Sequence, residues 1–169
     1  LMNPNKHRMK IKHILSLVAV TILLFSSNLS SQTAEPVTLP NGWKLTPAGK
    51  QFPLGDLPLN MAVSPNKKWL AVTNNGYGRQ CVQLFDTKRQ VMTSDVTIPM
   101  SWYGLCFSPD NKRLYVSGGN ENKIRIYTVS TIGKLAQMDS IVMDKPWPVK
   151  VSPTGIALSG KYRQLFVST

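Results

Sequence analysis

A block of twelve residues recurs along the chain at nearly constant spacing, and this repeat limits the folds open to it. Residues 61–72 (MAVSPNKKWLAV) match residues 105–116 (LCFSPDNKRLYV), 44 positions later and without a gap. A third copy, residues 156–167 (IALSGKYRQLFV), begins 51 positions after the second and carries Ser-Gly in place of Ser-Pro. Self-similarity at such a period is typical of proteins built from successive supersecondary units.

Each copy has the form of two short strands joined by a tight turn. Pro fixes φ at the turn, and the following Asp or Asn can bond back to nearby backbone. A third apolar run with period-two alternation follows at residues 81–85 and again at 123–127, and weaker fourth strands are expected over 91–98 and 135–142. Trp69, just after the first turn, is expected to cover the edge of its sheet.

Three or four short antiparallel strands in each repeat predict the blades of a β-propeller. A β-sandwich is the alternative, since it also joins short strands by turns, but the 44-residue self-match favours the propeller. The fold class is therefore all-β, with about three blades of which the last is incomplete. A closed propeller needs about four to eight blades, so we expect the missing blades in a longer protein. The alternative is an oligomer that completes the ring.

The N-terminal segment has the organisation of a secretory signal peptide. Four basic residues and no acid precede an apolar run of twelve residues (14–25, ILSLVAVTILLF), and small and polar residues follow. Twelve helical residues span about 18 Å, short of the roughly 30 Å hydrocarbon core, although a retained anchor helix is the alternative. We expect a signal-peptide helix within residues 1–31, a lead-in segment at 32–52 and the blades at 53–169. The location is then periplasmic or extracellular, with no membrane span after cleavage.

Removing residues 1–31 changes both the charge and the available chemistry. The net charge falls from +12 to +8, and His7 and His13, the only histidines, are lost. A catalytic triad or a His-ligated metal is therefore excluded within the remaining chain. We expect no catalytic residue, metal site or cofactor here. The basic pairs lie at predicted turns rather than on one face, so no nucleic-acid partner is expected.

The repeats resemble those of YVTN-type β-propellers, which belong to the propeller-lactonase-like superfamily. The residues that carry the resemblance are 62–66 (AVSPN), 105–110 (LCFSPD) and 114–117 (LYVS). Residues 39–49 (LPNGWKLTPAG) and 57–65 (LPLNMAVSP) also resemble the start of exported two-part proteins. In these, an alkaline-phosphatase-like phosphoesterase domain follows an N-terminal propeller. The resemblance covers residues 38–169 and implies an architecture more than a chemistry.

Loops that enter the innermost strand of each blade are the places to look for a ligand site. They carry Asn60, Trp102, Tyr103 and Thr154, which offer amide, aromatic and hydroxyl groups. In the alternative interpretation Trp102 and Tyr103 pack between blades and Asn60 caps a turn. Gly-rich segments at 76–78 and 118–119 are interpreted as hairpin turns, not phosphate cradles.

Cys81 and Cys106 are the only cysteines and fall on adjacent predicted blades. In an oxidising compartment they could form a disulfide, but both occupy apolar strand positions, which favours two buried free thiols.

Three functions are open. The first is an exported propeller that acts as a binding or scaffold module for an unidentified ligand or protein at one face. The second, implied by the resemblance, is a phosphoesterase whose catalytic domain lies beyond Thr169. The third, also implied by the resemblance, is a lactonase-like propeller hydrolase.

Overall fold

The computed structural model describes residues 36–46, 49–161 and 163–169, and the expected signal-peptide helix lies outside these residues. The chain divides into two compact units, residues 1–51 and 52–169. In the first unit β1 (Val37–Thr38) and β2 (Lys44–Leu45) form a small antiparallel hairpin. Its turn is closed by a hydrogen bond from the backbone N–H of Trp43 to the Asn41 side chain, 3.1 Å long.

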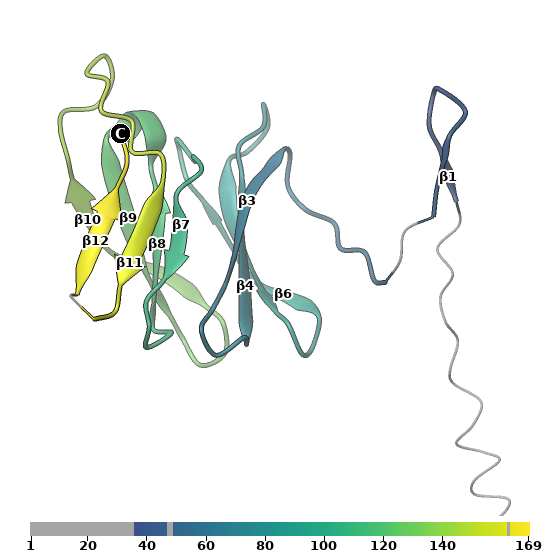
Figure 1. The fold of residues 1–169 in the computed structure, drawn as a ribbon, viewed down its shortest axis with the longest axis horizontal. Helices are drawn as coiled ribbons and strands as arrows, with labels where there is room; N and C mark the ends of the chain where they lie inside the picture. Colours follow the sequence, from purple (N-terminus) through teal and green to yellow (C-terminus); the bar gives the residue numbers. More distant parts are fainter. Residues whose placement is uncertain (1–35, 47–48, 162) are drawn as a thin grey trace, which may run out of the picture. The chain divides into compact units, whose positions relative to one another are not determined.

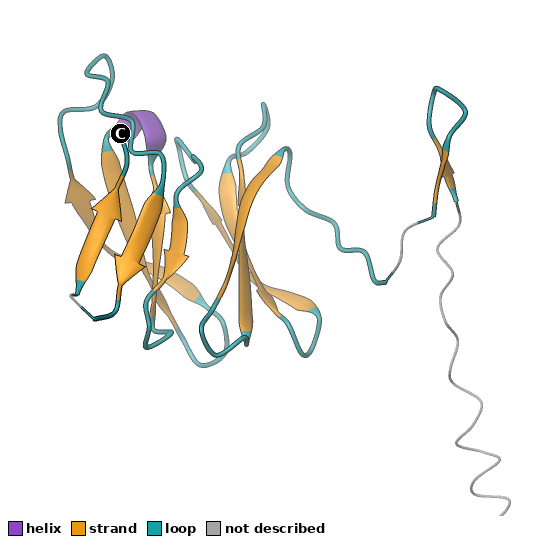
Figure 2. Ribbon diagram, in the orientation of Figure 1, coloured by secondary structure: helices purple, strands orange, loops and turns teal. Residues whose placement is uncertain are grey.

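The second unit is all-β and consists of three successive antiparallel sheets (Figure 1). Blade 1 contains β3 (Pro58–Val63), β4 (Trp69–Asn74), β5 (Cys81–Asp86) and β6 (Val91–Thr97). Blade 2 contains β7 (Leu105–Phe107), β8 (Arg113–Ser117), β9 (Lys123–Val129) and β10 (Leu135–Val142). Blade 3 contains β11 (Ile156–Ser159) and β12 (Gln164–Val167). Among the described residues the only helix is the 3₁₀ turn Gly119–Glu121 (Figure 2).

The three sheets are arranged as consecutive blades of a propeller. In each sheet the strands pair in chain order, as the repeat predicts. The first strands lie together, since β3 contacts β7 and β7 contacts β11, while the last strands β6 and β10 also meet. The predicted all-β, partial propeller fold is therefore confirmed, and the predicted fourth strands appear as β6 and β10.

The recurring turn is closed by the same hydrogen bonds in both complete blades. Ser64 accepts from the backbone N–H of Trp69 at 2.9 Å, and its equivalent Ser108 accepts from Arg113 at 2.9 Å. Asn66 and Asp110 each accept from the backbone N–H two residues later, at 3.0 Å. Polar side chains at these positions thus replace backbone partners where the chain reverses. The hydroxyl of Ser108, followed by the other turn bonds, lowers the pKa of the Asp110 carboxyl.

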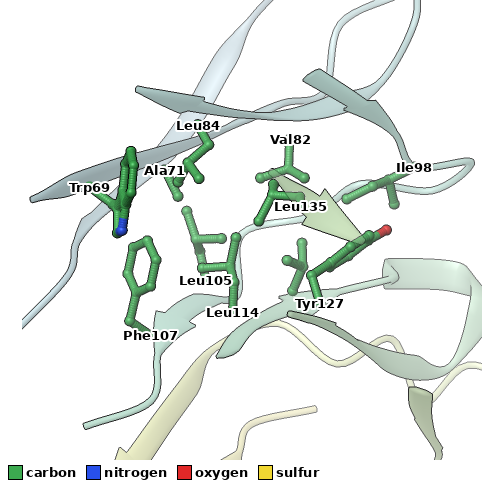
Figure 3. Packing of buried hydrophobic residues seen from close by; sticks show 11 residues of the cluster. Trp69, Ala71, Val82, Leu84, Ile98, Leu105, Phe107, Leu114, Tyr127 and Leu135 are labelled. Carbon is green, nitrogen blue, oxygen red and sulfur yellow. The ribbon is translucent and has the colours of Figure 1, made fainter. Parts of the chain in front are cut away.

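A continuous apolar core fills the space between blades 1 and 2 (Figure 3). Alternate residues of each strand point to opposite faces of a sheet, so β4 and β5 contribute Trp69, Ala71, Val82 and Leu84 from one face. Blade 2 supplies the facing side chains, which are Leu105, Phe107, Leu114, Val116, Tyr127 and Leu135. The opposite face of blade 2 packs on blade 3 through Tyr115, Ile124 and Ile126.

Trp69 belongs to this core and does not cover a sheet edge as expected. Its side chain is 3% exposed, and its ring lies against Gly133. A Cβ added at Gly133 would come within 2.6 Å of that ring, and Gly133 has φ +79°. A glycine in the distant β9–β10 turn thus makes the space that lets Trp69 enter the core.

Each complete blade also carries a polar network of one arginine, one acid and one glutamine. The blade-1 network is Arg79, Gln83 and Asp95, and the blade-2 network, 42 residues later, is Glu121, Arg125 and Gln137. Arg79 contacts Asp95 at 2.6 Å, and Gln83 donates to the same carboxylate at 3.1 Å. The two blades therefore have equivalent networks, but the arginine, the acid and the glutamine occupy different positions in each.

Candidate functional site

Four loops from the same end of the sheets enclose a cavity of about 380 Å³. In antiparallel sheets the β4–β5, β6–β7, β8–β9 and β10–β11 connections emerge at one end, which we call the loop face. The residues that line the cavity come from all four connections: Asn75, Gln80, Met100, Ser101, Trp102, Gly119, Asn120, Ser152 and Thr154. The cavity therefore depends on the assembly of several repeats and not on any one of them.

The β6–β7 loop is held in place by Gln80. The side-chain oxygen of Gln80 accepts a hydrogen bond of 2.7 Å from the backbone N–H of Ser101, and its backbone carbonyl accepts one of 3.0 Å from Ile98. Ile98 is fully buried and belongs to the core between blades 1 and 2. These contacts fix the base of the loop and leave Trp102, 42% exposed, at the cavity wall.

Gly119 permits the close approach of the β8–β9 loop to the β6–β7 loop. Its φ is +49°, and an added Cβ would lie 3.3 Å from both the Met100 carbonyl oxygen and the Trp102 Cβ. Its backbone N–H donates to the Ser117 hydroxyl at 3.1 Å, while that hydroxyl donates to the Pro153 carbonyl. The Ser117 backbone N–H also donates to the Gly104 carbonyl of the β6–β7 loop at 2.8 Å, so three loops are joined around one buried serine.

Asn122 anchors the long β10–β11 loop, which forms the remaining wall. This side chain is fully buried, and its Nδ2 donates to the carbonyls of Lys145 and Val149 at 2.5 and 2.6 Å. Its Oδ1 accepts from the Ser152 backbone N–H at 2.8 Å. On the cavity side, the Ser152 hydroxyl donates to Asn120 Oδ1 at 2.9 Å.

Ser101 is the unusual member of this wall. The residue is 2% exposed, and its hydroxyl oxygen has no hydrogen-bond partner among the described residues. Burying a hydroxyl without a partner costs about 1–3 kcal/mol, so such groups are rare in folded proteins. The oxygen has almost no accessible surface, so it is enclosed by the wall and does not open to the cavity.

Two of the four predicted site residues, Trp102 and Thr154, line the cavity. Asn60 and Tyr103 are not among the lining residues, but they connect blades 1 and 2, because Asn60 Nδ2 donates to the Tyr103 carbonyl at 2.8 Å. Asn60 lies within β3 rather than in the loop before it. Tyr103 is 49% exposed, so neither it nor Trp102 is packed away between blades.

Sequence reasoning missed the amide and serine side chains of the cavity. Asn75 and Asn120 lie in segments that carry ordinary hairpin signals, and Ser101 directly precedes the predicted Trp102. The one local clue is that residues 101–104 (SWYG) and 152–155 (SPTG) occupy equivalent positions, 51 residues apart. Ser101 and Ser152 therefore reach the same cavity from successive repeats.

Both cysteines are free thiols in the structure. Cys81 is buried, and its sulfur accepts from Asn74 Nδ2 at 3.4 Å, whereas Cys106 packs against the cluster between blades 2 and 3. Burial raises the pKa of the Cys81 thiol, and it raises that of Cys106 to about 11. The two cysteines lie in different environments, and the disulfide considered from the sequence is not formed.

Four charged residues near the loops, Arg79, Asp95, Glu121 and Arg125, belong to the two polar networks. Burial alone would raise the pKa of the Asp95 carboxyl, but hydrogen bonds from Arg79 and Gln83 outweigh it and leave the pKa below its ordinary value. Arg125 bonds Glu121 through Nε at 3.0 Å and Nη2 at 2.6 Å, and Gln137 through Nη1 at 2.8 Å. Within residues 36–46, 49–161 and 163–169, no group of three or more His, Cys, Asp or Glu is placed to hold a metal ion.

A second hollow, of about 330 Å³, lies on the face of blade 1 that points away from blade 2. It is apolar and is lined in part by Met61, Leu70, Val72 and Phe85, with Phe52 against the Phe85 ring at 6.1 Å between centroids. The equivalent residues of blade 2 are buried against blade 1. This face therefore has the character of a blade–blade contact surface.

The arrangement of blades and the shared loop-face cavity define the chain as an all-β protein with a partial β-propeller. No helix in the described part of the chain is both long and apolar enough to cross a membrane. No protein-family model matches the sequence, and no curated protein matches it.

Among the similar solved structures, one has a TM-score above 0.5 and supports the fold class. Hydrazine synthase of Kuenenia stuttgartiensis superposes with a TM-score of 0.53 and 20% identity, over 65% of this chain and 28% of that one. A candidate 6-phosphogluconolactonase of Bacteroides fragilis has a TM-score of 0.46 and 22% identity, covering 51% and 26%. A protein of unknown function from Desulfotomaculum acetoxidans has a TM-score of 0.46 and 11% identity, covering 66% and 49%. The chain thus spans less than half the length of each, and the likeness to hydrazine synthase concerns the fold alone.

Proposed function

We propose that the chain is the N-terminal part of an exported β-propeller that acts as a binding or scaffold module and recognises its ligand at the loop face. The observation that carries the proposal is the convergence of four loops, from all three sheets, on one cavity. Ligand sites are concave, with a few placed polar groups among apolar ones, and a cavity of this size is within their usual range of about 300–1,000 Å³.

A ligand screen by thermal unfolding tests the binding role. A ligand at about one hundred times its Kd stabilises the folded state by about 2.7 kcal/mol, which gives a clear rise in Tm. Ser152→Tyr fills the cavity and is expected to abolish that rise, whereas Trp43→Ala, at a 71% exposed tryptophan in the first unit, is expected to preserve it. Ligands whose effect survives Ser152→Tyr would place recognition elsewhere.

Export is supported by the basic, apolar and small-residue pattern of residues 1–31. Expression of the full chain in a bacterium with an intact secretion system should yield a periplasmic or secreted product whose N-terminus begins near Gln32. Replacing residues Leu23 and Leu24 by Arg shortens the apolar run and should leave the protein in the cytoplasm with residues 1–31 attached. An uncleaved product anchored in the membrane would favour the anchor-helix alternative.

An enzyme is the alternative of a different class. The likeness of residues 39–65 to the start of two-part propeller phosphoesterases supports a hydrolase whose catalytic domain follows Thr169, and the YVTN-type repeats also occur in lactonase-like propellers. Assay of the complete gene product against generic phosphoesters and lactones separates these functions. Turnover by the complete product but not by residues 1–169 would support the phosphoesterase, and lactone hydrolysis by residues 1–169 would support the lactonase.

A further inference from the structure

The side chains around the loop-face cavity have one chemical character. They are uncharged, although the whole chain carries a net charge of +12. Asn75, Gln80 and Asn120 bring side-chain amides, which both donate and accept hydrogen bonds, and Ser152 and Thr154 bring hydroxyls. A lining of this kind matches a ligand that offers many neutral donors and acceptors, whereas an anion would be bound by Arg or Lys.

The tryptophan in the wall adds a flat apolar surface to these groups. Trp102 is 42% exposed, and Gly119 packs so close to it that an added Cβ would lie 3.3 Å from the Trp102 Cβ, so the base of the side chain is fixed. An indole face suits the apolar face of a ring whose edges carry hydroxyls. Amides can bond the hydroxyls at the edges of such a ring, and an aromatic surface can pack against its face.

From these two observations we infer that the loop-face cavity binds a neutral polyhydroxylated ring, the chemistry of an uncharged carbohydrate. Trp102 packs on the face of the sugar, and the side-chain amides of Asn75 and Asn120 bond its hydroxyl groups. The inference rests on the proposed binding function and specifies the ligand class for the same cavity.

A glycan-binding experiment on the full chain tests the inference. The probes are immobilised neutral oligomers of glucose, galactose, mannose, xylose and N-acetylglucosamine, with oligogalacturonate and sulfated dextran as anionic counterparts. We expect retention of at least one neutral probe, unchanged between 50 and 500 mM NaCl, because salt screens charge–charge attraction and leaves neutral contacts intact. This tenfold rise in salt shortens the screening length about threefold.

Three variants assign the binding to the cavity. Trp102→Ala should weaken it about tenfold, the value of one aromatic contact, and Trp43→Ala should leave it unchanged. Asn75→Ala should weaken it about fivefold, as loss of one hydrogen bond does.

The outcomes separate the ligand class from the binding function. Retention of the anionic probes alone, with loss of binding in salt, would overturn the neutral-sugar inference. If these anionic complexes are weakened by Trp102→Ala, the proposed function stands with a different ligand class. If Trp102→Ala and Trp43→Ala behave alike for every bound probe, both the inference and the loop-face function fail.

Discussion

Replacing Arg125 by glutamine tests how much the blade-2 network contributes to stability. The Arg125 side chain is 10% exposed and that of Glu121 is 17% exposed, and the guanidinium holds the carboxylate by bonds of 3.0, 2.8 and 2.6 Å. Arg125→Gln leaves this buried carboxylate with Lys123, at 3.1 Å, as its remaining cation. Removing one partner of a buried ion pair costs about 3–5 kcal/mol, and the remaining lysine favours the lower end, about 3 kcal/mol.

The blade-1 network provides the matched control. Its ion pair joins Arg79 and Asp95, whose side chains are 51% and 24% exposed, so water already solvates the charges. Exposed pairs contribute little to stability. Arg79→Gln should therefore lower the free energy of unfolding by clearly less than Arg125→Gln does, although the two arginines belong to equivalent networks.

A double-mutant cycle then isolates the pair energy. Glu121→Gln leaves the Arg125 charge buried and unpaired, and its cost should be similar to that of Arg125→Gln. The double variant removes both charges together, so its cost should be about 3 kcal/mol instead of the sum of about 6, a coupling of about 3 kcal/mol. Urea unfolding followed by tryptophan fluorescence measures all three. The reasoning is refuted if the costs of the two single variants add up in the double variant, or if Arg79→Gln costs as much as Arg125→Gln.

Three further expectations concern the core, a thiol and the open face of blade 1. Leu114→Ala removes a fully buried side chain from the core and should cost about 3 kcal/mol in urea unfolding, whereas a loss below about 1 kcal/mol would mean that this core is loosely packed. Because burial raises the pKa of Cys106 to about 11 from an ordinary value near 9, alkylation at pH 8 should be roughly a hundredfold slower than in the urea-unfolded chain. The folded state keeps the Cys106 thiol protonated up to a higher pH than the unfolded chain does. The contribution of this thiol to stability is therefore present below about pH 9 and is lost as the pH rises towards about 11. Equal alkylation rates in the folded and unfolded chains would contradict the burial. Met61, 65% exposed on the apolar face of blade 1, should promote concentration-dependent association that Met61→Glu reduces in sedimentation velocity, and a monomer at all concentrations would count against a contact surface there.

Much of the fold can be predicted from local patterns in the sequence. The expected fourth strand at 91–98 is β6, Val91–Thr97, and the one at 135–142 is β10 with the same bounds. These predictions succeed because alternation and turn residues are properties of neighbouring positions. The position of Trp69 could not be predicted in this way, since it depends on the space left by Gly133, more than sixty residues away.

The candidate site is harder to predict because its residues are brought together only by the stacking of blades. Asn75, Ser101 and Ser152 come from three different connections, and only Ser101 and Ser152 are related by the repeat. Trp102 and Thr154 were found because the loops before inner strands meet near the centre of a propeller. The unsatisfied hydroxyl of Ser101 is a property of the packed structure alone.

Comparison of the three inner loops shows where the repeats differ in function. Residues 57–60 (LPLN), 101–104 (SWYG) and 152–155 (SPTG) occupy equivalent positions. The last position serves packing in two of them: Asn60 donates to the Tyr103 carbonyl, and Gly104 approaches Thr154 so closely that a Cβ would lie 2.7 Å from its carbonyl oxygen. The second position carries proline twice and tryptophan once, in Trp102, which packing of the inner strands does not require. Since the apolar strand positions recur in every copy and this residue does not, recognition by the chain is best sought where one repeat departs from the others.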